Sequence, residues 1–109
     1  MPKYLLEVSY SPEGLQGVMK DTASGRKAAV QKMVKAAGGK LEAFYYSFGD
    51  NDVVAITELP DNTVAASLSL ALGASGLVHG RTTPLLSVEE MDKAIKIKTK
   101  TKYQAPGTK

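Results

Sequence analysis

Two runs of aromatic and β-branched residues lie close together in the middle of the chain, separated only by a polar turn. The first run is Lys40–Phe48, the second is Asp52–Leu59, and Gly49–Asn51 stands between them. Such side chains fit a pleated, half-buried surface, and Gly, Asp and Asn are the residues that tight turns select. This segment predicts a β-hairpin, and any fold of the chain must contain it.

The residues before the hairpin predict a strand and two helices. Lys3–Tyr10 alternates between two faces, which indicates a strand. Ser11 and Pro12 then provide a helix cap and a first-turn proline. We expect a short helix here, a break near Thr22–Gly25, and a longer helix over Arg26–Ala37 that ends at two glycines.

The residues after the hairpin predict a helix, a strand and a second helix. Apolar residues recur at helical spacing after Pro60, and this helix should end near Gly73–Gly76. Leu77–Thr83 alternates again and indicates a strand. Ser87 is followed three positions later by an acidic residue, which predicts the start of a short helix that ends near Lys93.

The C-terminal segment alternates strictly between β-branched or aromatic residues and lysines over residues 95–103. This pattern predicts a fifth strand, which would be either an edge strand or solvated arm of its own subunit or a strand that joins the sheet of a neighbouring subunit. Six lysines and no acidic residue lie from Lys93 onward, whereas 8 basic and 11 acidic residues precede it. Because the basic charge is confined to this end, nucleic acid or an anionic surface is a weak candidate partner.

The predicted order of strand, helix, strand, strand, helix, strand is that of the split βαβ (βαββαβ), ferredoxin-like arrangement. It is an α+β fold with an antiparallel sheet and helices on one face. Its predicted strands carry apolar residues on both faces, so the second face needs a cover. In a chain of 109 residues we expect a second copy to supply it as a dimeric α/β barrel. We divide the chain into a domain of residues 1–92 and a lysine-rich strand and tail of residues 93–109.

Several short motifs are similar to those of one family. In chain order they are Gly38-Gly39-Lys40-Leu41, Tyr45-Tyr46, Gly49-Asp50-Asn51-Asp52, Glu58-Leu59-Pro60-Asp61, and Gly76 with Arg81-Thr82-Thr83. With these motifs, Tyr4 to Glu90 resembles the GYD-domain family, placed among the dimeric α/β-barrel, ferredoxin-like proteins. Of the Gly-Tyr-Asp signature, Gly49 and Asp52 match, and Asn51 stands at the tyrosine position. The resemblance implies the fold and self-association, and it brings no established activity.

The last strand of the predicted sheet carries two candidate functional side chains. His79 and Arg81 share one face, and pairing of the last strand with the first brings them near Glu7 or Ser9. A neutral histidine beside a carboxylate can move protons, and arginine can hold a carboxylate or enolate. The candidates for catalysis are therefore His79, Arg81 and Glu7. The alternative is an ion pair of Arg81 with Glu7 or Glu58, with the histidine in a dimer interface.

The hairpin offers further candidates for ligand binding. Tyr45 and Tyr46 could line a pocket between two sheets, or they could belong to the core or an interface. Asp50 and Asp52 carry the oxygen ligands that hard cations prefer, but these residue types are also common turn formers, which favours a turn. We expect no metal and no cofactor. The expected ligand contacts are Tyr45, Tyr46, Asp52, His79 and Arg81.

The composition excludes several classes of function but identifies none. The chain has no cysteine, which excludes disulfides and thiolate catalysis, and its single histidine excludes a histidine cluster within one chain. No apolar stretch approaches the roughly 20 residues that cross a bilayer, and we expect a cytoplasmic protein. The sequence favours a self-associating protein that binds a small ligand or has a structural role. The alternative is a cofactor-independent isomerase, dehydratase or monooxygenase that uses His79 and Arg81.

Overall fold

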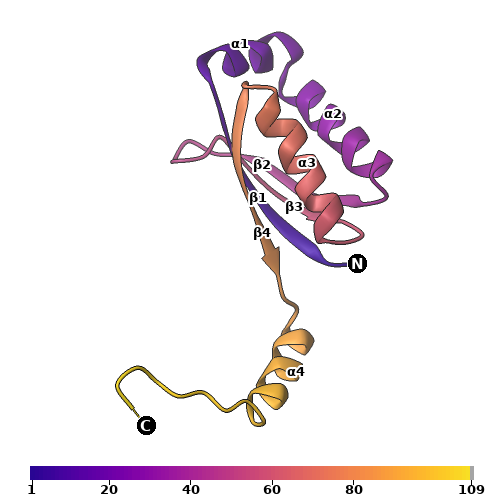
Figure 1. Ribbon diagram of the computed structural model, residues 1–109. Helices are drawn as coiled ribbons and strands as arrows, with labels where there is room; N and C mark the ends of the chain where they lie inside the picture. Colours follow the sequence, from indigo (N-terminus) through magenta and orange to yellow (C-terminus); the bar gives the residue numbers. More distant parts are fainter. Residues whose placement is uncertain (109) are drawn as a thin grey trace.

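The computed structural model describes residues 1–108, which fold as an α+β body followed by a C-terminal helix that lies apart from it (Figure 1). Its elements are β1 (Lys3–Tyr10), α1 (Pro12–Asp21), α2 (Ala23–Ala36), β2 (Lys40–Tyr46), β3 (Val53–Glu58), α3 (Asn62–Ala74), β4 (Val78–Leu85) and α4 (Val88–Lys98). The four strands form one antiparallel sheet, and α1, α2 and α3 lie on one side of it. The predicted α+β class and antiparallel sheet are confirmed.

Strand β1 lies at the centre of the sheet, in the order β2-β3-β1-β4. It pairs with β3, where Leu5 lies opposite Ile56, and with β4, where Leu5 lies opposite Thr83. The predicted hairpin forms β2 and β3, with Tyr45 opposite Val54. The first and last strands pair as the sequence predicted, so the side chains of β4 lie beside those of β1.

The helix side of the sheet holds the hydrophobic core. Tyr4 of β1 is only 1% exposed, and Ala55 of β3 is buried on the same face. Val34 of α2 and Ala65 of α3 belong to one buried cluster with Tyr4. The Tyr4 hydroxyl donates a hydrogen bond of 2.6 Å to Oδ1 of Asn62, so the one polar atom of this large ring has a partner at the start of α3. We call this side of the sheet the covered face.

A single residue, Thr22, separates α1 from α2. Ser11 caps α1 by accepting a hydrogen bond of 3.0 Å from the Gly14 N–H, and Thr22 caps α2 by accepting one of 3.2 Å from the Gly25 N–H. Thr22 has a φ of 71°, a backbone region that is unusual for a β-branched residue. The predicted break near Thr22–Gly25 is confirmed, and it is short because Thr22 turns the chain by itself.

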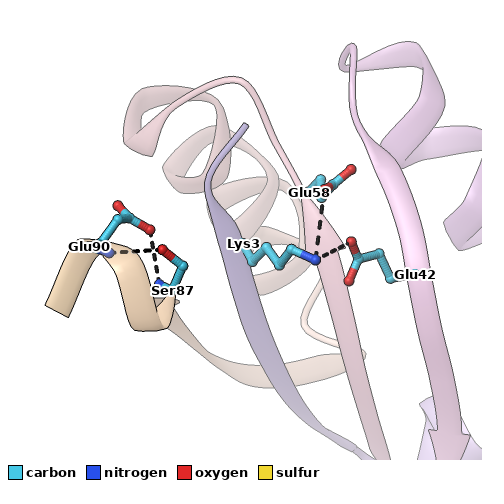
Figure 2. Close-up of polar contacts among 5 residues, drawn as sticks. All are labelled: Lys3, Glu42, Glu58, Ser87 and Glu90. Atoms are coloured by element: carbon cyan, nitrogen blue, oxygen red, sulfur yellow. Dashed lines mark hydrogen bonds and ion pairs between the residues drawn. The ribbon is translucent and has the colours of Figure 1, made fainter. Parts of the chain in front are cut away.

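The predicted fifth strand over residues 95–103 is wrong. Val88–Lys98 forms the helix α4, and no strand follows it within the described residues. Ser87 and Glu90 form a capping box, in which the backbone N–H of each donates a hydrogen bond of 3.0 Å to the side chain of the other (Figure 2). The helix begins where the sequence predicted but does not end near Lys93. Alternation alone does not make a strand, because strand backbone groups need a neighbouring strand, whereas helix backbone groups bond within their own segment.

Helix α4 has no buried residue and projects from the end of β4, away from the sheet and the other helices (Figure 1). The predicted edge strand is therefore overturned, whereas the alternative of a solvated arm agrees with the exposed helix. Pairing of this segment with a neighbouring subunit stays a prediction. The predicted boundary after residue 92 lies inside α4 and stays a prediction.

Candidate functional site

The side of the sheet that faces away from α1, α2 and α3 is not covered by any element of the described chain (Figure 1). We call it the bare face. Its middle is apolar, because Leu5 of β1 lies between Ile56 of β3 and Thr83 of β4, and Ala43 of β2 lies beyond Ile56. An antiparallel sheet with one side in water usually presents polar residues there. The middle of the bare face departs from this pattern.

One end of the bare face forms an open cleft of about 370 Å³. It is lined by Glu7, Asp50, Asn51, His79, Gly80 and Arg81. Within the sheet, Glu7 lies directly opposite Arg81, and Ser9 lies directly opposite His79. Directly opposite residues of antiparallel strands have their Cβ atoms about 5 Å apart. The structure thus brings together the three residues that the sequence singled out for chemistry.

The charges in the cleft are not neutralised by an internal ion pair. Glu7 accepts a hydrogen bond of 3.3 Å from the Asn51 side-chain amide, and no ion pair within residues 1–108 involves Arg81. Glu58 lies near Lys3 instead, with 3.9 Å between the ammonium nitrogen and the carboxylate. The ion pair of Arg81 with Glu7 or Glu58, which the sequence left open, does not form. Arg81 therefore lines the cleft without an ion-pair partner among residues 1–108.

The turn between β2 and β3 forms one wall of the cleft and is fixed to the end of β1. The Asp52 carboxylate accepts a hydrogen bond of 2.8 Å from the Tyr10 N–H, and the Asp52 N–H donates one of 2.8 Å to the Val8 carbonyl. The Ser9 hydroxyl donates one of 3.0 Å to the Asp50 carbonyl. One carboxylate oxygen of Asp52 accepts from the backbone of β1, which holds the turn in place. Its expected contact with a ligand stays a prediction. No group of three acidic or histidine side chains in the described chain is placed to hold a metal ion.

The two tyrosines of the hairpin point to opposite faces of the sheet and cannot line one pocket. Tyr45 lies on the bare face opposite Val54, and it is 70% exposed. Tyr46 lies on the covered face, where its hydroxyl donates a hydrogen bond of 3.0 Å to the Ala23 carbonyl and its ring meets Phe44 edge-on at 5.4 Å. Partial burial raises the pKa of Tyr46 above its usual value.

At the opposite end of the bare face, a small charged cluster joins three strands. The Lys3 ammonium lies 2.7 Å from the Glu42 carboxylate and near Glu58 (Figure 2). The hydrogen bond from Lys3 lowers the pKa of Glu42, and the same bond raises the pKa of Lys3. The bare face is therefore divided into a charged end, an apolar middle and a polar cleft.

Sequence reasoning missed Asn51 as a residue of the site. It treated the turn as a connection, although the turn must lie beside the end of β1 once β3 pairs with β1. The order of the residues could have indicated this contact, because Asp52 immediately precedes β3 and Glu7 lies near the end of β1 that pairs with the start of β3. Asn51 therefore falls within reach of Glu7.

Taken together, these features define a small α+β protein whose antiparallel sheet is covered on one side and carries a polar cleft on the other. The model of the GYD domain family matches residues 4–95, so the chain belongs to this family, as its motifs predicted. No curated protein and no solved structure matches the chain. No helix among the described residues is long and apolar enough to cross a lipid bilayer.

Proposed function

We propose that the protein is a homodimer that closes the bare faces of two sheets on each other and binds a small polar acid in the cleft at Glu7, His79 and Arg81. The observation that carries this proposal is the apolar middle of the bare face, centred on Leu5 and Ile56, on a sheet that has helices on one side only. The strand order β2-β3-β1-β4 with both crossovers on one side supports the ferredoxin-like split βαβ arrangement. Two such sheets packed face to face would form the dimeric α/β barrel.

The lining of the cleft selects the chemical class of the ligand. Arg81 offers several N–H donors in a planar fork, which suits a carboxylate. Glu7 lies across the strand pair and offers only acceptors, so a second anionic group would be repelled. Asn51 can both donate and accept. A small hydroxy acid has one carboxylate for Arg81 and a hydroxyl that can donate to Glu7. Its oxygen atoms can also accept from Asn51.

The dimer is tested by light scattering on the native chain and on Ile56→Asp. We expect twice the chain mass for the native protein and the single-chain mass for Ile56→Asp, because a carboxylate buried between two sheets would lose its hydration. The matched control is Leu70→Asp, an identical charge placed on an exposed leucine of α3. A native chain that elutes as a monomer, or equal masses for all three proteins, would refute the dimer.

The ligand is tested by following the His79 ring signals in NMR spectra during titration with lactate. We expect saturable shifts at millimolar lactate that disappear in Arg81→Ala and persist in Arg81→Lys with weaker affinity. The control is Lys40→Ala, an exposed cation of β2 outside the cleft. Shifts that persist unchanged in Arg81→Ala would place lactate elsewhere and overturn the assignment.

Catalysis without a cofactor is the second candidate, because the cleft combines a histidine, a carboxylate and an arginine. In a single chain His79 is exposed on the edge strand β4, which favours binding over proton transfer. A partner subunit that encloses His79 would change this balance. The test is proton exchange at C2 of lactate in deuterated water: incorporation that stops in His79→Asn favours an enzyme, and no incorporation favours a binding protein.

A further inference from the structure

A second cavity lies on the covered face, on the opposite side of the sheet from the cleft. Its volume is about 220 Å³, and it lies between α1, α3 and the ends of β1 and β4. Most of its lining is apolar, including Val18, Leu72 and Val78. An apolar cavity of about 150 Å³ is large enough to take up benzene. The space under α1 therefore has room for one six-membered ring with a substituent.

The cavity exists because the inner side of α1 carries little bulk. Gly14 is required there, since a Cβ at this position would collide with the carbonyl oxygen of Leu77. Gly17 lies one turn later and also lines the cavity, but a Cβ at Gly17 would have no neighbouring side chain or strand of the described chain within 4 Å. Close packing explains the first glycine and not the second. The space beside Gly17 is left open although a larger residue would fit.

The polar end of the cavity is built by Arg26, Tyr10 and Asp21. The Arg26 side chain is 30% exposed, and its guanidinium lies 3.6 Å from the Asp21 carboxylate, longer than a hydrogen bond. Arg26 and Tyr10 also line a smaller space that continues toward Phe44. An arginine has five N–H donors. The ion pair with Asp21 engages one nitrogen of Arg26, so the guanidinium keeps donors for a second anion, provided that anion approaches Arg26 on the side away from the Asp21 carboxylate.

The joint between α1 and α2 fixes this arrangement. Asp21 is the last residue of α1, Arg26 lies in the first turns of α2, and Thr22 between them has a φ of 71°. Its side chain also caps α2. A β-branched residue in this region persists only where the surrounding structure holds it. Here the turn at Thr22 directs both charged side chains toward the same cavity.

We propose that the cavity under α1 binds a single-ring aromatic carboxylate, with the ring against Val18 and Leu72 and the carboxylate on the Arg26 guanidinium. The ring matches the apolar lining and the volume, and the carboxylate matches the planar fork of donors. The site uses residues of one chain only. It does not depend on the dimer or on the ligand of the cleft.

Benzoate is the probe, and the methyl signals of Val18, Leu72 and Val78 in NMR spectra are the readout. We expect saturable shifts of these methyl groups on titration of the full chain with benzoate. Gly17→Leu fills the cavity and should abolish the shifts, while its unfolding temperature stays at or above that of the native chain because leucine favours the helix over glycine. Ala71→Leu fills the same space from α3 and replaces Gly17→Leu as the test variant if Gly17→Leu does not fold.

The charge requirement is tested with Arg26→Gln and with benzyl alcohol, which has the ring without the carboxylate. We expect Arg26→Gln to weaken benzoate binding by about 10- to 100-fold, the loss typical of a charged hydrogen bond, and to leave benzyl alcohol binding unchanged. Absence of methyl shifts at millimolar benzoate, or shifts that survive both filling variants, would overturn the proposal. If Arg81→Ala abolished the benzoate shifts, benzoate would bind in the cleft and not in the cavity under α1. The proposals for the cleft and for the cavity can therefore be refuted independently of each other.

Discussion

The two faces of the sheet are formed by alternate residues of the same strands, yet only one of them is covered by helices. On β1, Tyr4 is buried under the helices, whereas Leu5, the next residue, lies on the bare face and stays partly exposed. On β3, Thr57 and Ile56 show the same contrast. A substitution on the covered face should therefore change the folding of one chain. A substitution on the bare face should change what the folded chain associates with.

The largest effect expected from this contrast is that of Tyr4→Ala. Removing a fully buried ring should lower the free energy of unfolding by about 3–5 kcal/mol, as large-to-small aromatic substitutions in cores do. Urea denaturation measures it. Tyr4→Phe is the control, since it removes only the hydrogen bond to Asn62 and should cost about 1 kcal/mol.

Leu5→Ala is the partner experiment on the bare face. It should destabilise a dilute chain less than Tyr4→Ala, and the difference between variant and native chain should grow with protein concentration if dimers form. A loss for Leu5→Ala that equals that of Tyr4→Ala and does not depend on concentration would remove the distinction between the two faces.

The next effect is a gain in stability. The Thr57 side-chain hydroxyl is fully buried on the covered face and has no hydrogen-bond partner in the described chain. Thr57→Val keeps the shape and removes the unsatisfied oxygen, so the free energy of unfolding should rise by about 1–2 kcal/mol. Thr57→Ser, which keeps the hydroxyl and loses a methyl group, should lower it. A loss of stability in Thr57→Val would mean that the hydroxyl has a partner in solution, such as a water molecule.

A smaller effect is expected at the charged end of the bare face. The hydrogen bond from Lys3 holds the pKa of Glu42 below its ordinary value of 4.5. A carboxylate with a lowered pKa stabilises the folded chain above its ordinary pKa, and this contribution is lost as the pH falls through the folded value. On acidification from about pH 5 to about pH 3, a range around the ordinary pKa of a glutamate, the free energy of unfolding should therefore fall more in the native chain than in Lys3→Met. Identical pH profiles of the two proteins would show that the pair contributes nothing measurable.

The smallest effect is expected beyond both faces, in α4. Ending the chain after Leu86 should leave the urea midpoint of the body unchanged, because α4 has no buried residue. The far-ultraviolet circular dichroism should lose the helix signal of about one short helix. A clear drop in the midpoint would show that α4 packs on the body or on a second copy in solution.

The sequence predicted the body of the fold because each of its signals is local. Alternation in β1 and the turn residues at Gly49–Asn51 act over a few positions, and the pairing of β1 with β4 follows from the order of the elements. That pairing was enough to bring Arg81 and His79 near Glu7 or Ser9, and the structure adds the register that sets Arg81 opposite Glu7. The part of the site that local signals did not give is Asn51, which reaches Glu7 only through the three-dimensional path of the turn.

The wrong strand at the C-terminus has a physical cause that the body does not share. Residues 95–103 alternate as well as β1 does, but β1 has a strand on each side and this segment has none. Without a neighbouring strand, the first part of the segment, up to Lys98, satisfies its backbone groups within α4, which begins at the Ser87 cap. Residues 99–103 form neither a helix nor a strand. Tyr45 and Tyr46 were expected to line one pocket, but as neighbouring residues of a strand they lie on opposite faces of the sheet.

The central place of β1 sets the order in which the sheet can assemble during protein synthesis. The hairpin of β2 and β3 closes through a short turn, whereas Lys3 of β1 meets Leu85 of β4 at the far end of the body. Contacts between distant residues form late, because closing a longer loop costs more entropy. From the ribosome, β1 emerges first and receives its second neighbour last. Until β4 arrives, one edge of β1 exposes unpaired backbone groups, and a chain that stalls before Leu85 keeps that edge open to other nascent strands.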